Sequence, residues 1–235
     1  MRSIAIITAR GGSKRIPRKN VKEFCGKPIL LYSIEAALSS GCFDEVMVST
    51  DDEEIARLAK DAGASVPFLR SEKTAGDFAT TADVIEEVLN EYEKLGQQFE
   101  YACILYPTAP FVTGDKLREA MKMLQEKGAD SVLPIVQFSF PPQRAFVSKE
   151  GKIRFAEEKF AKTRSQDLEP MYHDSGQFCC FTTELFLNKH TLVTDNTLGI
   201  VYPESEVQDI DNYEDWYMAE LKYTMMKERN HGLSD

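Results

Sequence analysis

The chain has 235 residues, a formal net charge of −10, a hydrophobic share of 43% and a charged share of 28%. This length fits one α/β domain with a small appendage and is enough to bury a sizeable core. The acidic balance argues against general binding to nucleic acids or anionic membranes, because both need a broad basic surface.

The first two thirds of the chain alternate between short apolar runs and amphipathic stretches. The apolar runs predict strands over residues 4–8, 45–49, 65–69, 101–105 and 131–136. The amphipathic stretches predict helices over residues 29–38, 52–62, 80–95 and 113–127. Elements in this order form a parallel sheet with helices on both faces. Ligands bind beyond the carboxyl ends of such strands, so a site is expected in the loops after Thr8, Thr50 and Leu105.

The pattern changes after Pro141. Residues 143–162 are polar and predict a hairpin-like excursion, and the chain then returns to apolar runs. Further elements are predicted as strands over 177–181 and 198–202 and as a helix over 213–227, with Asn212 as its cap. We therefore predict one domain over residues 1–235, with residues 143–177 as a small protruding subdomain.

Five cysteines stand at irregular spacings, with no Cys-x-x-Cys pair and no Cys/His cluster. An odd number of scattered thiols is typical of a reduced, cytoplasmic protein. The adjacent Cys179 and Cys180 would point to opposite faces of a strand and so could not hold one metal together. The apolar stretch Ile4–Ile7 is too short for a signal-peptide core, and no run approaches a membrane span of about 18 residues.

The segment from Arg10 to Lys22 contains six basic residues and no acidic one. Gly11 and Gly12 would let backbone N–H groups approach a phosphate closely, and the cations would neutralise a polyanion. The alternative is a solvated charged loop, which its position after the first strand disfavours. The Gly-x-Gly-x-x-Gly and P-loop patterns are both absent from the sequence.

Three segments carry a family resemblance: Ile6–Asn20 (IITARGGSKRIPRKN), Gly26–Pro28 and Val48–Asp51. Together they resemble the acylneuraminate cytidylyltransferases, which are the CMP–sialic acid synthetases and their relatives. Thr163–Asp167 and Tyr172–Phe178 look most similar to the pseudaminic acid cytidylyltransferases within that family. The resemblance extends from the N-terminus to about Tyr213. It implies a Rossmann-like three-layer α/β nucleotidyltransferase fold with a protruding dimerisation subdomain, and hence a homodimer.

The resemblance also assigns roles to individual residues. It implies catalytic roles for Arg10, Lys19 and Asp209. The residues that it implies for nucleotide binding are Ala9, Arg10, Gly11, Gly12, Lys14, Lys19, Asn20, Arg70, Thr80 and Thr81. Asp209 and Asp211 match a late Asp-x-Asp motif that would hold Mg²⁺ or Mn²⁺. Alternation along an extended segment puts these two carboxylates on one face, about 6 to 7 Å apart, although a helix N-cap before Tyr213 is the alternative.

Sugar recognition is expected from a second set of residues. These are Tyr106, Arg144, Arg164, His173 and Gln177, with an arginine pairing the sugar carboxylate. Tyr106 stands where sialic acid synthetases usually carry Gln, which argues against sialic acid itself. The sequence His173-Asp174-Ser175 does not predict a hydrolase triad, because neighbours in an extended chain face opposite ways.

The expected reaction is transfer of CMP from CTP to the anomeric C2 hydroxyl of a nonulosonic acid, with release of pyrophosphate. Pseudaminic acid is the first candidate, and legionaminic, sialic and 3-deoxy-manno-octulosonic acids are alternatives. A nucleotide-binding module without catalysis is a rival from another class. A dinucleotide-dependent oxidoreductase is disfavoured by the missing glycine fingerprint.

Overall fold

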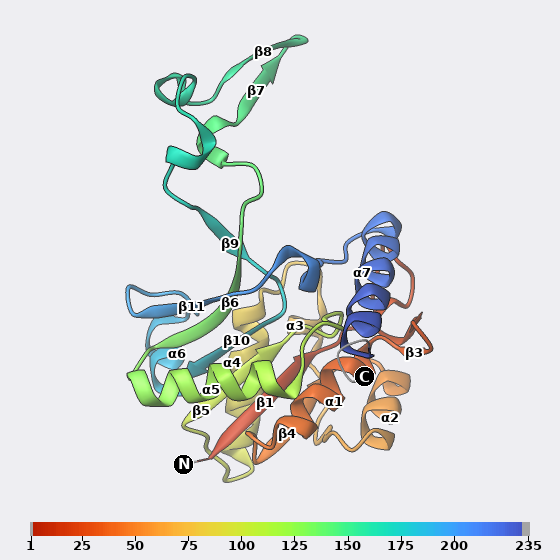
Figure 1. The fold of residues 1–235 in the computed structure, drawn as a ribbon. Helices are drawn as coiled ribbons and strands as arrows, with labels where there is room; N and C mark the ends of the chain where they lie inside the picture. Colours follow the sequence, from red (N-terminus) through yellow and green to blue (C-terminus); the bar gives the residue numbers. More distant parts are fainter. Residues whose placement is uncertain (1, 232–235) are drawn as a thin grey trace.

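The computed structural model describes residues 2–231, so the predicted single domain over 1–235 extends past the described residues at both ends (Figure 1). Within this range a central sheet runs in the order β11-β6-β10-β5-β1-β4, and β9 pairs with the end of β6. Its strands are β1 (Ser3–Thr8), β4 (Glu45–Ser49), β5 (Tyr101–Leu105), β6 (Ser131–Gln137), β9 (Tyr172–Asp174), β10 (Phe178–Thr182) and β11 (Thr197–Val201). Two hairpins stand apart from the sheet: β2 (Glu23–Phe24) with β3 (Lys27–Pro28), and β7 (Phe146–Lys149) with β8 (Lys152–Phe155).

Helices cover both faces of the sheet. They are α1 (Leu30–Ser40), α2 (Glu53–Asp61), α3 (Glu72–Ala75), α4 (Thr81–Lys94), α5 (Gly114–Lys127), α6 (Thr183–Lys189) and α7 (Tyr213–His231). Short 3-10 turns occur at Lys19–Val21, Pro142–Arg144, Glu158–Phe160, Ser165–Asp167 and Glu204–Glu206. None of the helices between residues 2 and 231 combines the length and apolar character needed to cross a bilayer.

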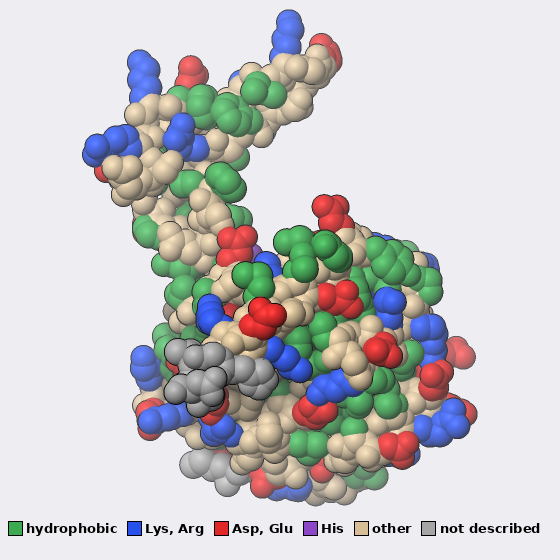
Figure 2. Space-filling model, turned by 45° about the vertical axis from the view of Figure 1, so that its right-hand side comes forward, with side chains coloured by type: hydrophobic (Ala, Val, Ile, Leu, Met, Phe, Trp, Pro, Cys, Tyr) green, Lys and Arg blue, Asp and Glu red, His purple; other side chains and the backbone are tan. Residues whose placement is uncertain are grey.

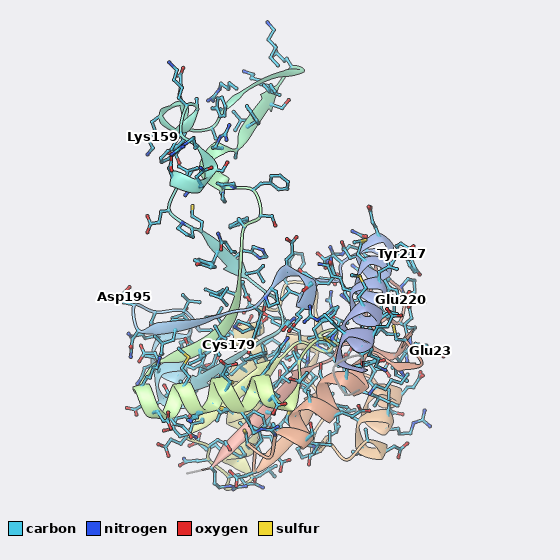
Figure 3. All side chains as sticks on the ribbon, in the orientation of Figure 1. Glu23, Lys159, Cys179, Asp195, Tyr217 and Glu220 are labelled. Atoms are coloured by element: carbon cyan, nitrogen blue, oxygen red, sulfur yellow. The ribbon has the colours of Figure 1, made fainter. Side chains whose placement is uncertain are left out.

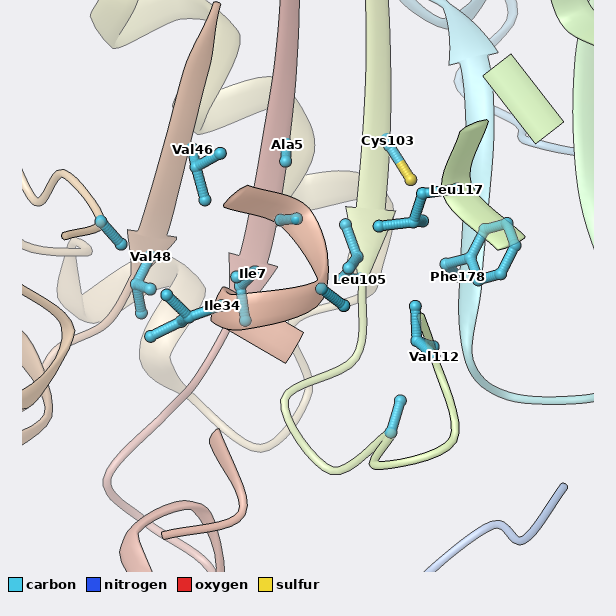
Figure 4. Close-up of a cluster of buried hydrophobic side chains, with 14 of the residues drawn as sticks. Ala5, Ile7, Ile34, Val46, Val48, Cys103, Leu105, Val112, Leu117 and Phe178 are labelled. Carbon is cyan, nitrogen blue, oxygen red and sulfur yellow. The ribbon is translucent and has the colours of Figure 1, made fainter. Parts of the chain in front are cut away.

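Alternation along the strands divides the core into two layers. Ala5 and Ile7 of β1 pack with α1, α2 and α5 on one face, as Figure 4 shows for part of this cluster. Ile4 and Ile6 face the opposite way, against α4 and α6. Burial on both faces explains why the central strands are continuously apolar rather than alternating with polar residues. The three-layer α/β fold predicted from the sequence is confirmed.

Cysteines follow the same alternation. Cys180 packs in the α1 and α5 layer and Cys179 in the α4 and α6 layer, as predicted. Cys180 lies opposite Cys103 on β5, with 3.1 Å between the two sulfur atoms, and both side chains are fully buried. These thiols therefore belong to the core.

The parallel arrangement predicted for the strands in the first two thirds of the chain is confirmed for β1, β4 and β5, but the complete sheet is mixed. Strand β10 runs antiparallel between β5 and β6, because the chain enters it from the excursion rather than from a crossover helix. The predicted strand over residues 65–69 was wrong, since only Ser65 forms a bridge, to Met47 of β4. Pro67 lacks an N–H for a ladder, and Leu69 is largely exposed, so the segment leaves the sheet after Ser65.

The excursion forms an arm, which we define as residues 138–171. The arm leaves the sheet at the end of β6, carries the β7–β8 hairpin and returns at β9 (Figure 1). The predicted hairpin-like excursion is therefore present. The arm ends before the predicted limit of residue 177, because β9 pairs with β6 and Gln177 is buried in the main body.

Helix α7 packs on a small aromatic cluster at one end of the main body. Phe24 contacts Tyr32, Trp216 and Tyr223 edge to face, with ring centroids 5.5 to 5.6 Å apart. Ile210, just before the helix, is buried in the same cluster. This packing fixes the chain segment that carries Asp209 and Asp211.

Candidate active site

One cavity of about 490 Å³ opens at the carboxyl ends of β1 and β5. Four chain segments surround it: the loop after β1, the loop after β5, the link between β9 and β10, and the segment before α7. Its lining residues are Thr8, Arg10, Ser13, Lys14, Arg15, Ile16, Lys19, Asn20, Tyr106, Pro107, Thr108, Asp174, Gly176, Asp209 and Asp211. The cavity thus lies at the edge of the sheet where the sequence predicted a ligand site.

The basic segment supplies most of the positive charge of the cavity. Of its six cations, Arg10, Lys14, Arg15 and Lys19 line the cavity. Arg10 and Lys14 both pair with the exposed carboxylate of Asp77, with Arg10 at 2.9 Å. These two hydrogen bonds, Lys14 first, hold the pKa of Asp77 below its ordinary value. Arg10 and Lys14 therefore already bind a carboxylate, which is an anionic group that a phosphate could replace.

Lys19 links the basic segment to the opposite wall of the cavity. Its Nζ donates a hydrogen bond of 2.7 Å to the carbonyl of Ile210, between Asp209 and Asp211. Burial lowers the pKa of Lys19, and the two carboxylates oppose that shift. A partly desolvated ammonium acts more strongly on a bound anion than one in bulk water.

Asp209 and Asp211 both face the cavity. Burial first, and then the charge of Asp211, raises the pKa of Asp209 above its ordinary value, so this carboxylate is incompletely neutralised by protein groups. Arg15 pairs with Asp211 at 2.7 Å. Neither carboxylate caps α7, because Asn212 accepts from the N–H groups of Glu214 and Asp215. The predicted Asn212 cap is confirmed and the cap alternative for the two aspartates is wrong.

This pair of carboxylates fits a divalent cation. Hard oxygen ligands are what Mg²⁺ prefers, and Mg²⁺ usually binds one or two carboxylates together with water and substrate phosphates. Among residues 2–231, no group of three or more His, Cys, Asp or Glu side chains is arranged to hold a metal by itself. A cation at Asp209 and Asp211 would therefore depend on oxygens of a bound phosphate to complete its ligands.

Asn20 and Gly11 shape the backbone of the basic segment. Asn20 is buried and donates from Nδ2 to the carbonyl of Arg10 at 2.8 Å, while its buried Oδ1 has no protein hydrogen-bond partner. The N–H of Gly11 donates to Asp51 at 2.9 Å. Ala9, with its N–H bonded to Ser49, is buried behind the cavity, and Gly12 lies in the same loop.

Six residues predicted for nucleotide binding do not line the cavity: Ala9, Gly11 and Gly12 of the loop after β1, and Arg70, Thr80 and Thr81. Arg70 is buried and donates to the carbonyl of Ser49 at 2.7 Å and to its hydroxyl at 3.1 Å. Thr80 caps α4, accepting from the N–H of Asp83, and Asp83 in turn accepts from the N–H of Thr80. Thr81 is the first residue of α4 and lies beside the phenol of Tyr106. Burial raises the pKa of Tyr106, and the hydrogen bond with the Thr81 side chain partly offsets this rise. Arg70 and Thr80 thus make structural contacts here.

The residues predicted for the sugar are divided between two places. Tyr106 lines the cavity, and Gln177 is buried behind it, donating to the carbonyl of Glu206 at 2.9 Å with its own Oε1 unpartnered. His173 is exposed on β9 beside Phe138. Arg144 and Arg164 lie on the arm, bonded to Ser165 and Asp167 respectively, and neither lines the cavity of its own chain.

Several cavity residues were missed from the sequence. Ser13 and Ile16 lie inside the basic segment, and Thr108 follows β5, so their position after predicted strands was an available signal. Asp174 and Gly176 precede β10. Asp77 does not line the cavity but pairs with Arg10 and Lys14 from a loop before α4. No local pattern marks these last residues, because the antiparallel return of β10 brings Asp174 and Gly176 to this edge.

Comparisons with known proteins agree with this geometry. The family profile described as cytidylyltransferase matches residues 4–198. A pseudaminic acid cytidylyltransferase from Campylobacter jejuni is 38% identical over 229 residues, which are 97% of this chain and 99% of that protein. A CMP-N,N'-diacetyllegionaminic acid synthase from Legionella pneumophila is 33% identical, over 94% of this chain and 95% of that protein.

Solved structures show the same fold. A CMP:2-keto-3-deoxy-manno-octonic acid synthetase complexed with CTP superposes with a TM-score of 0.70 at 15% identity, covering 97% of this chain and 100% of that one. A 4-diphosphocytidyl-2C-methyl-D-erythritol synthase from Anaerococcus prevotii gives a TM-score of 0.62 at 15% identity, over 95% and 98% of the two chains. The profile match and the identities over nearly whole sequences establish that the chain belongs to the cytidylyltransferase family of nucleotidyltransferase enzymes.

Proposed function

We propose that this protein transfers CMP from CTP to the C2 hydroxyl of a nonulosonic acid, with pseudaminic acid as the first candidate, and releases pyrophosphate. One observation carries the proposal: four cations face two aspartates across a single cavity. The cations suit a triphosphate, while two carboxylates can approach the same triphosphate only with a divalent cation between them. The names of the relatives from Campylobacter and Legionella support a nonulosonic acid as the acceptor.

The cations would bind and orient the triphosphate. Arg10 and Lys14 would exchange Asp77 for phosphate oxygens, which like a carboxylate form charge-assisted hydrogen bonds with cations. Lys19, fixed to the Ile210 carbonyl, would place its charge beside the reacting phosphate without moving during the reaction. A preorganised charge of this kind stabilises the negative charge that develops in the transition state.

Asp209 and Asp211 would hold the metal ion, Mg²⁺ or Mn²⁺. When bound, such an ion neutralises phosphate oxygens and favours departure of pyrophosphate. We also place Asp209 in the catalytic set with Arg10 and Lys19. It lies at the cavity, where its carboxylate would accept the proton of the attacking sugar hydroxyl.

We further propose that the protein acts as a homodimer and that the arm provides the contact. Phe146 of β7 and Ile153 of β8 are 56% and 67% exposed, and these two arm strands bury almost none of their side chains. Because Arg144 and Arg164 lie on the arm, they would reach a sugar carboxylate only in the cavity of the partner subunit. Tyr106 and Gln177 would contact the sugar from within the same chain.

Pyrophosphate release measured with CTP and a panel of nonulosonic acids tests the function. The panel contains pseudaminic, legionaminic, sialic and 3-deoxy-manno-octulosonic acids, and each is repeated with ATP, GTP and UTP. We expect release with CTP and fastest with pseudaminic acid. CTP binding without release from any sugar would instead support the nucleotide-binding module, and equal rates with all four nucleotides would remove the assignment to CTP.

A further inference from the structure

The six cations of the basic segment do not share one role. Four line the cavity, whereas Arg18 and Lys22 do not. The Lys22 ammonium lies over the ring of Trp216, 5.2 Å from its centroid, and so packs against α7. Arg18 points the other way, toward the start of α2, where its guanidinium pairs with Asp52 at 2.5 Å and also with Glu54.

Arg18 also has an unusual backbone conformation. Its φ of 56° and ψ of 32° lie in the left-handed region, which costs energy for any residue with a Cβ. The turn starts the 3-10 helix Lys19–Val21, and the Arg18 carbonyl accepts from the N–H groups of Val21 and Lys22 at 3.1 and 3.0 Å. Lys19 and Asn20, both lining the cavity, come directly after this turn. A residue keeps a strained backbone conformation only where its surroundings stabilise it, and here the carboxylates of Asp52 and Glu54 bind the Arg18 side chain.

Asp52 is itself fixed in place. It is the N-cap of α2, and its Oδ1 accepts from the N–H groups of Glu54 and Ile55 at 2.9 and 3.0 Å. Its side chain is only 19% exposed, so Oδ2 presents a partly buried charge to Arg18. The acceptor for Arg18 is therefore part of the rigid helix end rather than a freely rotating surface carboxylate.

The other end of the same loop is held at the same place. Gly11 donates its N–H to Asp51, and a Cβ on Gly11 would come within 2.8 Å of the Asp52 carboxylate. Gly11 and Arg18 bracket the residues that carry Lys14 and Arg15. The loop is thus attached at both ends to the Asp51–Asp52 pair that begins α2.

We propose that Arg18 is a positioning residue that, through Asp52 and Glu54, holds Lys19 and Asn20 at the cavity without touching the nucleotide. The inference deepens the proposed function, because it concerns how the same site binds a nucleoside triphosphate. The alternative is that Arg18 swings to the phosphates as a fifth cation. The two roles give opposite expectations for Asp52, which would anchor the loop in the first case and compete with the phosphates in the second.

Calorimetric titration of CTP in the presence of Mg²⁺, without sugar, distinguishes the two roles. R18Q is expected to weaken CTP binding about tenfold. D52N keeps the helix cap, since Asn caps about as well as Asp, and is expected to weaken CTP binding as well. The R18Q/D52N double variant should be about as weak as the weaker single variant, because both changes break one connection. Tighter CTP binding by D52N, additive losses, or unchanged binding by R18Q would each overturn the proposal.

Steady-state rates add a second readout. With the preferred sugar, R18Q is expected to raise the KM for CTP and leave the KM for the sugar nearly unchanged. R18K, which retains the charge, should recover part of the loss. A rise in both KM values together would point to general disruption of the site and contradict a role confined to the phosphate loop.

Limited trypsin digestion tests the positioning without any assumption about the reaction. Cleavage after Arg15 should be several-fold faster in D52N and R18Q than in the wild-type protein, because the loop is released from α2. K94Q, which removes an exposed ion pair with Glu91 on α4, is the matched control and should not change cleavage. Faster cleavage of the variants, in a protein that does not turn over CTP, would contradict the proposed function and support the positioning role. Unchanged cleavage of D52N would contradict the positioning role alone.

Discussion

The main body and the arm differ in how their strands are stabilised. Side chains of β1 and β5 in the main body are almost all fully buried between two layers of helices. Side chains of β7 and β8 in the arm are nearly all exposed, and Figure 2 shows hydrophobic and charged groups mixed along the arm as it stands clear of the body. Figure 3 places Lys159 on the arm and Cys179 inside the sheet, in surroundings of opposite character.

This difference indicates where each region obtains its stability. An isolated two-stranded hairpin is at best marginally stable in water. The arm has one aromatic contact across its hairpin, Phe146 with Phe155 at 4.5 Å between centroids, but none of the α-helices within residues 2–231 covers it. The body can therefore specify its own fold and cavity, whereas we expect the arm to gain stability from the partner subunit proposed above.

The largest effect is expected from removing a core aromatic. Phe181 is 1% exposed within the α4 and α6 layer, so F181A should lower the free energy of unfolding by about 3–5 kcal/mol. F146A, on the arm, should change it by less than about 0.5 kcal/mol in dilute, monomeric protein. Urea titrations, followed by the fluorescence of Trp216, measure the free energy of unfolding of both variants. Comparable losses in the two variants would mean that the arm and body form one cooperative unit.

The next effect is on catalysis and is confined to the body. D209N and D211N should each reduce turnover about a hundredfold, because metal binding is weakened, and extra Mg²⁺ should partly restore the rate. The fold should remain intact, as circular dichroism would show. D115N, at an exposed carboxylate on α5 that pairs with Arg118, is the control and should keep full activity. Full activity of the wild-type enzyme in a chelator would contradict the metal assignment.

A smaller effect is expected on self-association. A charge in the exposed apolar surface of the arm, introduced by I153D, should weaken dimerisation by about tenfold or more, because a charge would be desolvated at the contact. V193D places the same charge on an exposed apolar residue of the main body and should leave the dimer unchanged. Light scattering across micromolar concentrations reads out both. A wild-type monomer throughout that range would rule out the dimer.

The smallest effect concerns acid stability. Burial alone would raise the pKa of Asp52, but hydrogen bonds from Arg18 and the Ile55 N–H outweigh it and hold that pKa below the ordinary value. The charge of Asp52 therefore adds stability above the ordinary aspartate pKa of about 3.9, and this stability is lost as pH falls through the lower, folded value. Melting temperatures of wild type and D52N should thus differ by a few degrees at pH 7 and converge in acid. A difference that grew toward low pH would have the wrong sign.

Local chemistry determined most of the body. Apolar runs located β1, β4, β5 and β6, and the predicted helix starts at residues 80, 113 and 213 lie within one residue of where α4, α5 and α7 begin. The density of cations around Lys14 and the spacing of Asp209 and Asp211 predicted two groups of opposite charge. These features depend on side-chain periodicity and composition over a few residues, which the sequence contains in full.

Tertiary structure decided how those pieces are used. Strand β10 reverses direction because the arm returns the chain to the sheet from outside, a long-range connection that no local pattern encodes. The same connection from the arm to the sheet brings Asp174 and Gly176 to the cavity. Arg70 and Thr80, by contrast, form structural contacts with Ser49 and with the start of α4. Charge alone does not distinguish Arg18 from the other cations of the basic segment, and only the position of Asp52 at the start of α2 separates it from the four cations that line the cavity. Composition determines how many charges a segment carries, but the direction in which each one points depends on partners distant in the chain.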